Sequence, residues 1–324
     1  MPEEPRRPLP EPPEVEALVL AALAEDFGLI GPGSDDGAQL GRKLLARDVT
    51  TSATIPADVR FRGIVTARED MVVAGLPYAE RSWTALADLA EAGPVAFIAL
   101  VAEGSRVTAR TVLASVEGPA SIVLGGERTA LDFLMVLSGI ATESARWQDA
   151  ADAACRAIGR SERLVVTDTR KTVPAMRALS KYAVAVGGAT NHRAGLWDMV
   201  LIKDNHLALA GSVTAAVRAA RSSHPSLRIQ VEADSVEEAV EAARAGADFV
   251  LLDNMDDTKL AAAVVAVRRV AEGTGSRCAT EASGGVALER LPALAAAGID
   301  RVSTSKLTLT LPVDVALDLE DAGS

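Results

Sequence analysis

The sequence predicts an α/β protein with two parts: a small N-terminal domain of mostly antiparallel strands, and a C-terminal parallel barrel or doubly wound sheet. Three observations favour this fold class. The C-terminal half repeats a short apolar run, a polar stretch and a helical run, as parallel α/β folds do. Only 3% of the residues are aromatic although 49% are hydrophobic, so the core consists of Ala, Val and Leu, as is usual for α/β enzymes. Polar residues follow all six apolar runs, which favours a barrel, because every strand end then contributes to one site.

The N-terminal elements are predicted from proline content and apolar spacing. Residues 1–13 contain six prolines among charged residues, a composition typical of a disordered tail. Residues 14–27 carry apolar side chains at helical spacing. Residues 28–47, rich in glycine, are expected to be a loop or an insertion. Strand-like runs dominate from residue 48 to about 116, and one predicted helix, 78–91, interrupts them.

The C-terminal half begins with a long predicted helix, residues 127–158, which joins the two parts. Strands are predicted near residues 164–167, 199–202, 228–232, 248–252, 277–280 and 300–303. Helical runs between them include 235–245, 258–272 and 287–296. Gly246 and Gly298 occupy positions at which helices commonly end in glycine.

Composition excludes several classes of function. A net charge of -11 and a pI near 4.9 argue against general binding to nucleic acids or anionic membranes. Cys155 and Cys278 lack metal-ligand spacing and only three histidines are present, so neither a disulfide framework nor a structural zinc site is expected. The chain has no apolar signal-peptide core near its start and no uncharged run of 18 residues, so we expect a cytoplasmic protein.

Five potential cations lie between residues 167 and 206 of this acidic chain: Arg170, Lys171, His192, Arg193 and Lys203. Arg170 with Lys171, and Lys203, directly follow two short apolar runs of the kind that form buried parallel strands. Parallel sheets and barrels bind ligands at that edge. Arginines can bind carboxylates in bidentate fashion, and lysines act as point charges. The pattern predicts an anion-binding active site, although a solvated surface pair would explain Arg170 and Lys171 alone and a core position would explain His192.

Two acidic residues and a glycine-rich turn extend this predicted site. Glu232 and Asp253 end consecutive predicted strands, so both carboxylates can face one cavity. They either neutralise the cations or hold a hard cation such as Mg²⁺ that bridges a phosphate-rich substrate. Ser283-Gly284-Gly285 follows a strand and precedes a helical run, and its backbone N–H groups suit a phosphate.

Five motifs occur in an order that resembles one known family. They are Thr169-Arg-Lys-Thr-Val-Pro, Asn191-His-Arg-Ala-Gly-Leu, Leu201-Ile-Lys-Asp-Asn-His, Leu251-Leu-Asp-Asn-Met and Glu281-Ala-Ser-Gly-Gly. Together they are similar to quinolinate phosphoribosyltransferases, the carboxylating nicotinate-nucleotide pyrophosphorylases. Earlier segments, including Gly126-Glu-Arg-Thr-Ala-Leu, resemble the N-terminal domain and linking helix of this family. The resemblance covers about residues 15–320, except for 28–47.

The resemblance implies an N-terminal α/β sandwich and a C-terminal incomplete (β/α) barrel of the type II phosphoribosyltransferase kind. The sandwich would comprise residues 14–135, the barrel 136–305, and a segment 306–324 would return toward the N-terminal domain. The resemblance also implies a homodimer, or a multiple of dimers, in which Arg128 reaches the neighbouring active site.

The implied reaction joins quinolinate to phosphoribosyl pyrophosphate and releases CO₂ and pyrophosphate, giving nicotinate mononucleotide for NAD biosynthesis. Quinolinate would be held by Arg128, Arg170, Arg193 and Lys203, with His192 nearby. The implied catalytic residues are Lys171, Glu232 and Asp253. Lys171 would face the sugar phosphate or the departing pyrophosphate. Glu232 and Asp253 would position the ribose hydroxyls and Mg²⁺, the metal indirectly, through water or substrate. The 5-phosphate would be received by Ser283 and Gly284, near Ser305.

The sequence departs from the family pattern at several positions. Gln230 stands where the first of two glutamates is usual, and Gly187-Gly-Ala-Thr lacks a third glycine. Ser305 replaces a glycine, Lys306 an alanine, and Leu309 a polar or basic residue. Lys306 either replaces the lost cation or points outward. These changes leave open a paralogue that transfers phosphoribose to a different pyridine or related acid.

Two further classes remain compatible with the residues. A lyase or aldolase would use Lys203 as a Schiff-base lysine, but this does not explain Glu232 with Asp253. A non-catalytic metabolite-binding relative would explain Ser305 and Leu309, but not the retained cations.

Overall fold

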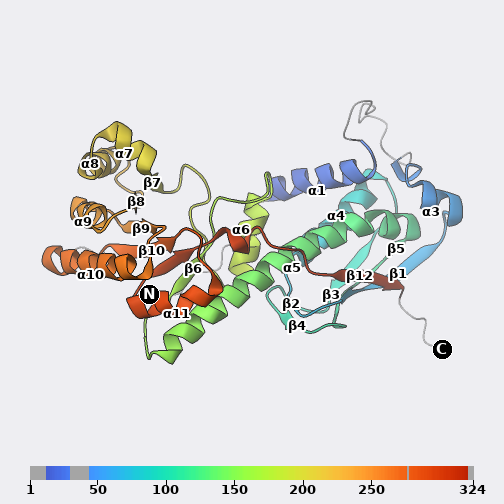
Figure 1. The fold of residues 1–324 in the computed structure, drawn as a ribbon. Coiled ribbons are helices and arrows are strands. Elements are labelled where there is room, and N and C mark those ends of the chain that lie inside the picture. Colours follow the sequence, from blue (N-terminus) through green and yellow to red (C-terminus); the bar gives the residue numbers. More distant parts are fainter. Residues whose placement is uncertain (1–11, 30–43, 276, 320–324) are drawn as a thin grey trace. The chain divides into compact units, whose positions relative to one another are not determined.

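The computed structural model describes residues 12–29, 44–275 and 277–319, which fold into two compact units (Figure 1). The parallel unit comprises residues 143–177 and 188–309. The antiparallel unit comprises the described residues up to 142, together with 178–187 and 310–319. Most of the predicted tail, and residues 30–43 of the predicted loop or insertion, lie outside the described residues.

The antiparallel unit is built on a sheet with the strand order β12-β1-β5-β3. Its strands are β1 (Arg60–Ala67), β3 (Ala96–Ala99), β5 (Val112–Pro119) and β12 (Val315–Leu319). A separate antiparallel pair joins β2 (Met71–Val72) to β4 (Arg106–Val107). Strand β12 pairs Val315 with Ala67, so the last described strand completes a sheet that begins near residue 60.

Helices α1 (Pro12–Asp26), α3 (Val49–Thr54), α4 (Leu76–Leu89) and α6 (Arg177–Val186) belong mainly to the antiparallel unit, as does the first part of α5 (Ala120–Ala157). Trp83 of α4 is fully buried in its core and donates its indole N–H to the Val123 carbonyl at 2.9 Å. Burial of a side chain of this size contributes roughly 2–3 kcal/mol, and the hydrogen bond removes the cost of burying its polar group.

Two sequence predictions for the N-terminal half are wrong in detail. Pro12 and Pro13 begin α1 rather than ending a tail, because the first turn of a helix does not need the N–H that proline lacks. Residues 49–54 are helical rather than strand-like. The Asp48 carboxylate accepts the Thr51 N–H at 2.9 Å, and this N-cap outweighs the strand preference of the β-branched residues that follow.

The long helix α5 begins at Ala120 rather than near residue 127. Glycines at positions 125 and 126 suggest a break, yet both lie inside the helix. An added Cβ on Gly126 would lie 2.7 Å from Cδ1 of Trp83. Glycine is therefore retained here for close packing against α4.

The parallel unit contains a six-stranded sheet, in the order β6-β11-β10-β9-β8-β7, in which all described neighbours are parallel. Its strands are β6 (Val165–Thr167), β7 (Val200–Ile202), β8 (Ile229–Ala233), β9 (Phe249–Asp253), β10 (Ala279–Ser283) and β11 (Arg301–Ser303). Among the described residues no ladder joins β6 to β7. The predicted α/β fold with an incomplete barrel is confirmed.

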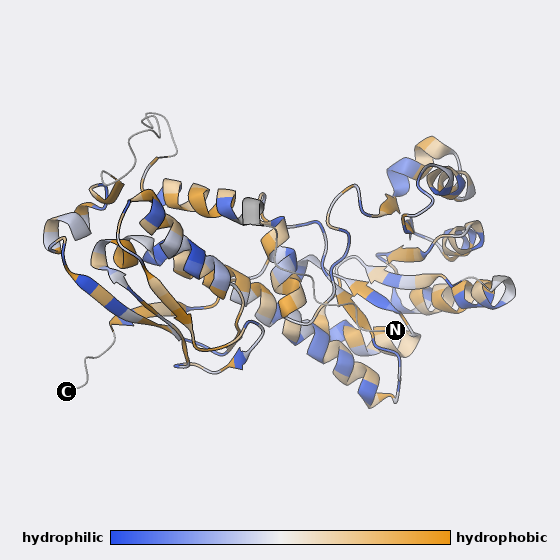
Figure 2. Ribbon diagram, turned by 180° about the vertical axis from the view of Figure 1, so that it is seen from behind, coloured by the Kyte–Doolittle hydropathy of each residue, from blue (hydrophilic) through white to orange (hydrophobic). Residues whose placement is uncertain are grey.

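The connections of the parallel unit are mostly helical: α7 (Asp204–Ala210), α8 (Val213–Ser223), α9 (Val236–Ala245), α10 (Asp257–Thr274) and α11 (Leu291–Ala297). Along α8, α9 and α10 hydrophobic and hydrophilic residues are interspersed (Figure 2), as expected for helices with one face on a sheet and the other in water. Ser235 caps the start of α9, and Gly246 and Gly298 end α9 and α11 in left-handed conformations, as predicted. No helix within the described ranges is long and apolar enough to cross a membrane.

Candidate active site

A cavity of about 520 Å³ lies at the carboxyl ends of the strands of the parallel unit. All six strand ends contribute to its wall, because parallel strands end at the same edge of the sheet. The residues singled out from the sequence that line it are Arg170, Lys171, His192, Arg193, Lys203, Glu232, Asp253, Ser283, Gly284 and Ser305. One cavity therefore holds the predicted cations, both predicted carboxylates and the glycine-rich turn.

Arg170 and Arg193 form a cationic region in this cavity. Burial lowers the pKa of the Arg193 guanidinium, and the charge of Arg170 lowers that pKa further, while Asp198 opposes the change. The Nε atom of Arg170 is buried and lacks a hydrogen-bond partner in the described part of the chain. A buried donor without a partner is costly, and the two like charges repel. An anion between the guanidinium groups would relieve both effects, so this region suits a carboxylate.

Two lysines of the cavity are held in different ways. The Lys203 ammonium donates to the Glu232 carboxylate at 2.8 Å, and the Lys203 side chain is 46% exposed, so it remains accessible to a ligand. Lys171 is fixed through its backbone. Its N–H donates to the Thr169 hydroxyl at 3.0 Å, and its carbonyl accepts the Thr308 hydroxyl at 2.7 Å. The Lys171 side chain makes neither bond, which leaves it available to a substrate.

A tight turn after β10 forms another part of the wall. Gly284 and Gly285 adopt φ angles of 88° and 57°. A Cβ on Gly284 would lie 2.1 Å from the Asn254 side-chain oxygen, so only glycine fits. Asn254 also donates its side-chain N–H to the Asp253 carboxylate at 2.7 Å. The turn thus places backbone N–H groups, which suit a phosphate, beside an oriented carboxylate. Asn254 was not among the predicted site residues, although its position directly after a strand was a usable signal.

The segment after β11 departs most from the family pattern. Ser305 and Lys306 begin the short 3₁₀ helix η3 (Ser305–Leu307), and the Thr304 hydroxyl accepts the Lys306 N–H at 3.2 Å. Lys306 lines the cavity. Its ammonium lies 5.7 Å from the centroid of the buried Trp147 ring, a distance at which the ring attracts a cation.

Glu232 and Asp253 are the predicted holders of Mg²⁺. The described ranges contain no group of three or more His, Cys, Asp or Glu side chains that could hold a metal ion. Mg²⁺ commonly keeps several waters and binds through one or two carboxylates together with substrate phosphates. The donor set therefore fits a metal held through water or substrate.

Glu281 is a functional candidate that sequence reasoning missed. Strand β10 extends to Ser283 rather than ending at 280, so Glu281 lies within the strand and is fully buried. The longer strand is explained by pairing with β9, which opposes Glu281 to Leu251. Burial alone would raise the pKa of its carboxyl, but His192 and Arg301 lower the pKa to about 2. A charged residue directly after a predicted strand was the available signal.

Arg128 belongs to the antiparallel unit, on α5. Its guanidinium is exposed and lies 3.4 Å from the Asp132 carboxylate. A surface pair of this kind contributes about 0.5 kcal/mol or less, so Arg128 is readily available to a different partner.

Comparison with known proteins places this chain among relatives. Residues 48–138 match the N-terminal domain of quinolinate phosphoribosyl transferase, and residues 140–318 match its C-terminal domain. The chain belongs to the quinolinate phosphoribosyltransferase family. The family resemblance of its motifs is thereby confirmed.

Individual relatives agree with this family assignment. The chain is 42% identical over 285 residues to a probable carboxylating nicotinate-nucleotide pyrophosphorylase of Synechocystis, covering 87% of this chain and 84% of that protein. It is also 42% identical over 219 residues to the human carboxylating enzyme, covering 67% and 70%. The crystal structure of NadC from Streptococcus pyogenes superposes with a TM-score of 0.80 at 30% identity, covering 96% of this chain and 98% of that one.

Proposed function

We propose that this protein transfers phosphoribose from phosphoribosyl pyrophosphate to quinolinate and removes one carboxylate, forming nicotinate mononucleotide, CO₂ and pyrophosphate in NAD biosynthesis. Relatives that match most of this chain are named as carboxylating nicotinate-nucleotide pyrophosphorylases. The observation that carries the proposal is the cavity itself. It joins a two-arginine region suited to carboxylates with a glycine turn suited to phosphate.

The acid binds at the cationic end of the cavity in this proposal. Arg170 and Arg193 bind its carboxylates, and the exposed ammonium of Lys203 supplies a third positive charge. Because two arginines and a lysine face one region, a dianion such as quinolinate is favoured over a monoanion such as nicotinate.

The sugar phosphate binds at the glycine turn of the cavity in this proposal. Ser283 and Gly284 offer the 5-phosphate a hydroxyl and backbone N–H groups, and Lys306 adds the positive charge that Leu309 does not supply. Glu232 and Asp253 face the ribose hydroxyls. Mg²⁺ held near these two carboxylates would neutralise charge on the departing pyrophosphate.

The reaction then needs no covalent enzyme intermediate. The bond between ribose C1 and the pyrophosphate oxygen breaks, its electron pair leaves with pyrophosphate, and the pyridine nitrogen bonds to C1. Positive charge that develops on the ribose is stabilised by Glu232 and Asp253. The ring nitrogen is now cationic, so it stabilises the electron pair left on the adjacent carbon when CO₂ departs. A proton then replaces the lost carboxylate.

The active unit in this proposal is a homodimer, or a multiple of dimers, in which Arg128 reaches the active site of the neighbouring subunit. Its exposed and weakly paired guanidinium supports this role. A fourth cation would then join the acid-binding region of each site.

A coupled assay tests the proposal. Purified protein is mixed with Mg²⁺, phosphoribosyl pyrophosphate and either quinolinate or nicotinate, and nucleotide formation and CO₂ release are followed together. We expect nucleotide and CO₂ in equal amounts when the acid is quinolinate, and neither product when it is nicotinate. Lys171→Ala should abolish turnover without changing the folded state, whereas Arg269→Ala, at an exposed cation outside the cavity, should remain active. Quinolinate binding without any product would contradict the proposal and indicate a repurposed relative.

A further inference from the structure

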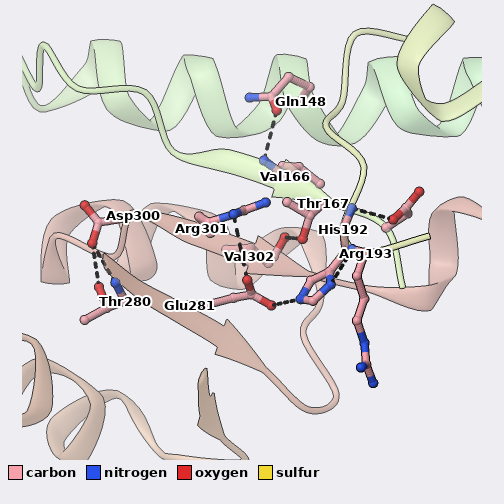
Figure 3. A network of polar contacts seen from close by, with 11 residues as sticks. Gln148, Val166, Thr167, His192, Arg193, Thr280, Glu281, Asp300, Arg301 and Val302 are labelled. Atoms are coloured by element: carbon pink, nitrogen blue, oxygen red, sulfur yellow. Dashed lines mark hydrogen bonds and ion pairs between the residues drawn. The ribbon is translucent and has the colours of Figure 1, made fainter. Parts of the chain in front are cut away.

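Two chain segments leave the parallel sheet side by side at the edge of the cavity. Strands β6 and β11 are neighbours in the sheet. The Thr167 hydroxyl donates to the Val302 carbonyl at 3.3 Å (Figure 3), and the Thr304 N–H donates to the Thr167 carbonyl at 3.1 Å. The segments that follow, 168–176 after β6 and 304–309 after β11, therefore start from fixed neighbouring positions.

The segment 168–176 carries Lys171 but contains no helix or strand. Lys171 is exposed and lines the cavity. Its ammonium is a point charge on a flexible four-carbon stem, so the region it can reach depends on where its backbone is held. The Lys171 N–H donates to the Thr169 hydroxyl at 3.0 Å. Because Thr169 belongs to the same segment, this bond does not fix the segment to the rest of the unit.

A contact from a distant part of the chain comes from Thr308, which directly follows η3. Its hydroxyl donates to the Lys171 carbonyl at 2.7 Å. The Ser305 carbonyl lies 3.3 Å from the same hydroxyl, but that oxygen already accepts the backbone N–H groups of Thr308 and Leu309 at 3.2 and 3.0 Å. A hydroxyl has one proton and a carbonyl has two lone pairs. The Thr308 proton is therefore donated along the shorter contact, to Lys171.

Thr308 has no direct access to a ligand of the cavity. It is 3% exposed, and within the described ranges it is not among the residues that line the cavity, whereas Lys171 and Lys306 are. Its hydroxyl can therefore act on a bound molecule only through the residues that it holds. Lys306 lies on η3, just before Thr308 in the chain. One hydroxyl thus joins the segment of one cavity lysine to the segment of another.

We propose that Thr308 is a positioning residue, whose hydroxyl holds the Lys171 backbone beside η3 so that Lys171 and Lys306 act on the same bound molecule. This inference rests on the proposed function in that both lysines bind phosphate groups of phosphoribosyl pyrophosphate. That ligand carries phosphate at two ends, the 5-phosphate and the pyrophosphate. Two lysines on joined segments bind it more tightly than two on independent segments, because less conformational freedom is lost on binding.

Hydrogen exchange followed by mass spectrometry tests the tether in the ligand-free protein. Thr308→Val removes the hydroxyl and keeps the branched shape of the side chain, while Thr308→Ser keeps the hydroxyl. We expect amide exchange in residues 168–176 to be about fivefold faster in Thr308→Val, for the loss of one hydrogen bond, and to match the wild type in Thr308→Ser. Unchanged exchange in Thr308→Val would overturn the proposal.

Thr280→Val is the matched control. Thr280 is also a buried threonine of the parallel unit, and its hydroxyl donates to the Asp300 carboxylate at 2.9 Å (Figure 3). It is not among the described residues that line the cavity. We expect Thr280→Val to leave exchange in residues 168–176 as in the wild type. Faster exchange there in both valine variants would show a general loosening of the fold and contradict the proposal.

Binding of phosphoribosyl pyrophosphate tests whether Thr308 acts through Lys171. Isothermal titration calorimetry with Mg²⁺ and without any acid measures the Kd in the absence of turnover. We expect Thr308→Val to raise the Kd about fivefold, and Thr308→Ser and Thr280→Val to change it less than about twofold. In a Lys171→Ala background, Thr308→Val should add less than about a further twofold, because the side chain through which it acts is gone. An equal fivefold loss in both backgrounds would refute the role of Lys171.

Failure of the proposed function gives a different result from failure of this inference. Wild-type protein that does not bind phosphoribosyl pyrophosphate would overturn the proposed function and the phosphate role of both lysines, while hydrogen exchange would still decide whether Thr308 holds residues 168–176. Wild-type binding together with unchanged exchange in Thr308→Val would refute the tether and leave the proposed function standing.

Discussion

Replacement of Gly284 by alanine gives the sharpest test of the phosphate turn. Gly284 has a φ of 88°, and Gly188 has almost the same φ of 87°. An added Cβ would lie 2.1 Å from the Asn254 oxygen at Gly284, but would meet nothing within 4 Å at Gly188. Gly188→Ala is therefore a matched control, because both variants carry the same left-handed strain of roughly 1–2 kcal/mol.

The difference between the two variants comes from Asn254. To make room for the new Cβ, Asn254 must move and its 2.7 Å hydrogen bond to Asp253 is lost. A hydrogen bond to a charged group contributes about 1.5–3 kcal/mol, and each 1.4 kcal/mol corresponds to a factor of about ten. We therefore expect Gly284→Ala to raise the KM for phosphoribosyl pyrophosphate about ten- to hundredfold above that of Gly188→Ala.

Initial rates at saturating quinolinate and varied phosphoribosyl pyrophosphate measure this effect, and thermal unfolding of both variants measures the shared strain. Both melting temperatures should fall, and that of Gly284→Ala should fall further, because this variant also loses the hydrogen bond between Asn254 and Asp253. If Gly284→Ala and Gly188→Ala have the same KM for phosphoribosyl pyrophosphate, the turn does not bind the phosphate and the argument from Asn254 is refuted.

Three further predictions follow from particular contacts. Lys203→Ala removes the 2.8 Å partner of Glu232. We expect the KM for quinolinate to rise about tenfold, while the protein loses less than about 1 kcal/mol of stability because Lys203 is half exposed. An unchanged KM would exclude Lys203 from acid binding. Gly139→Ala should lower the melting temperature in differential scanning calorimetry, because its Cβ would lie 2.5 Å from the Leu311 carbonyl oxygen. Such overpacking costs about 1–3 kcal/mol. A higher melting temperature would show that the backbone at Leu311 moves to make room for the methyl group. The pKa of Glu281 falls from an ordinary 4.5 to about 2 on folding, so its charge stabilises the fold above pH 4.5 and that contribution is lost as the pH falls toward 2. The difference in unfolding free energy between wild type and Glu281→Gln should therefore shrink over this range in urea titrations, and a constant difference would contradict the assigned charge.

Local patterns in the sequence were sufficient to locate the strands of the parallel unit and most of the cavity wall. Arg170, Lys203 and Asp253 each follow or end an apolar run, and parallel topology brings such positions to one edge. Their gathering could therefore be predicted without knowledge of any contact between them. Helix boundaries were predicted less well. At Asp48 a single local hydrogen bond decides that a helix begins, and at Gly126 tight packing keeps a glycine inside a helix.

By itself, the sequence determined the fold class, the family and the residues that meet in the cavity, because periodicity and strand-end chemistry are encoded within short windows. Tertiary structure alone decided the partners of Glu281. His192 and Arg301 lie far from it in sequence, and only the assembled sheet brings one against each of its oxygens. The pairing of β12 with β1 is of the same kind. A buried charge and an edge strand both require partners, and which partners they receive depends on how distant segments close around them rather than on their neighbours in the chain.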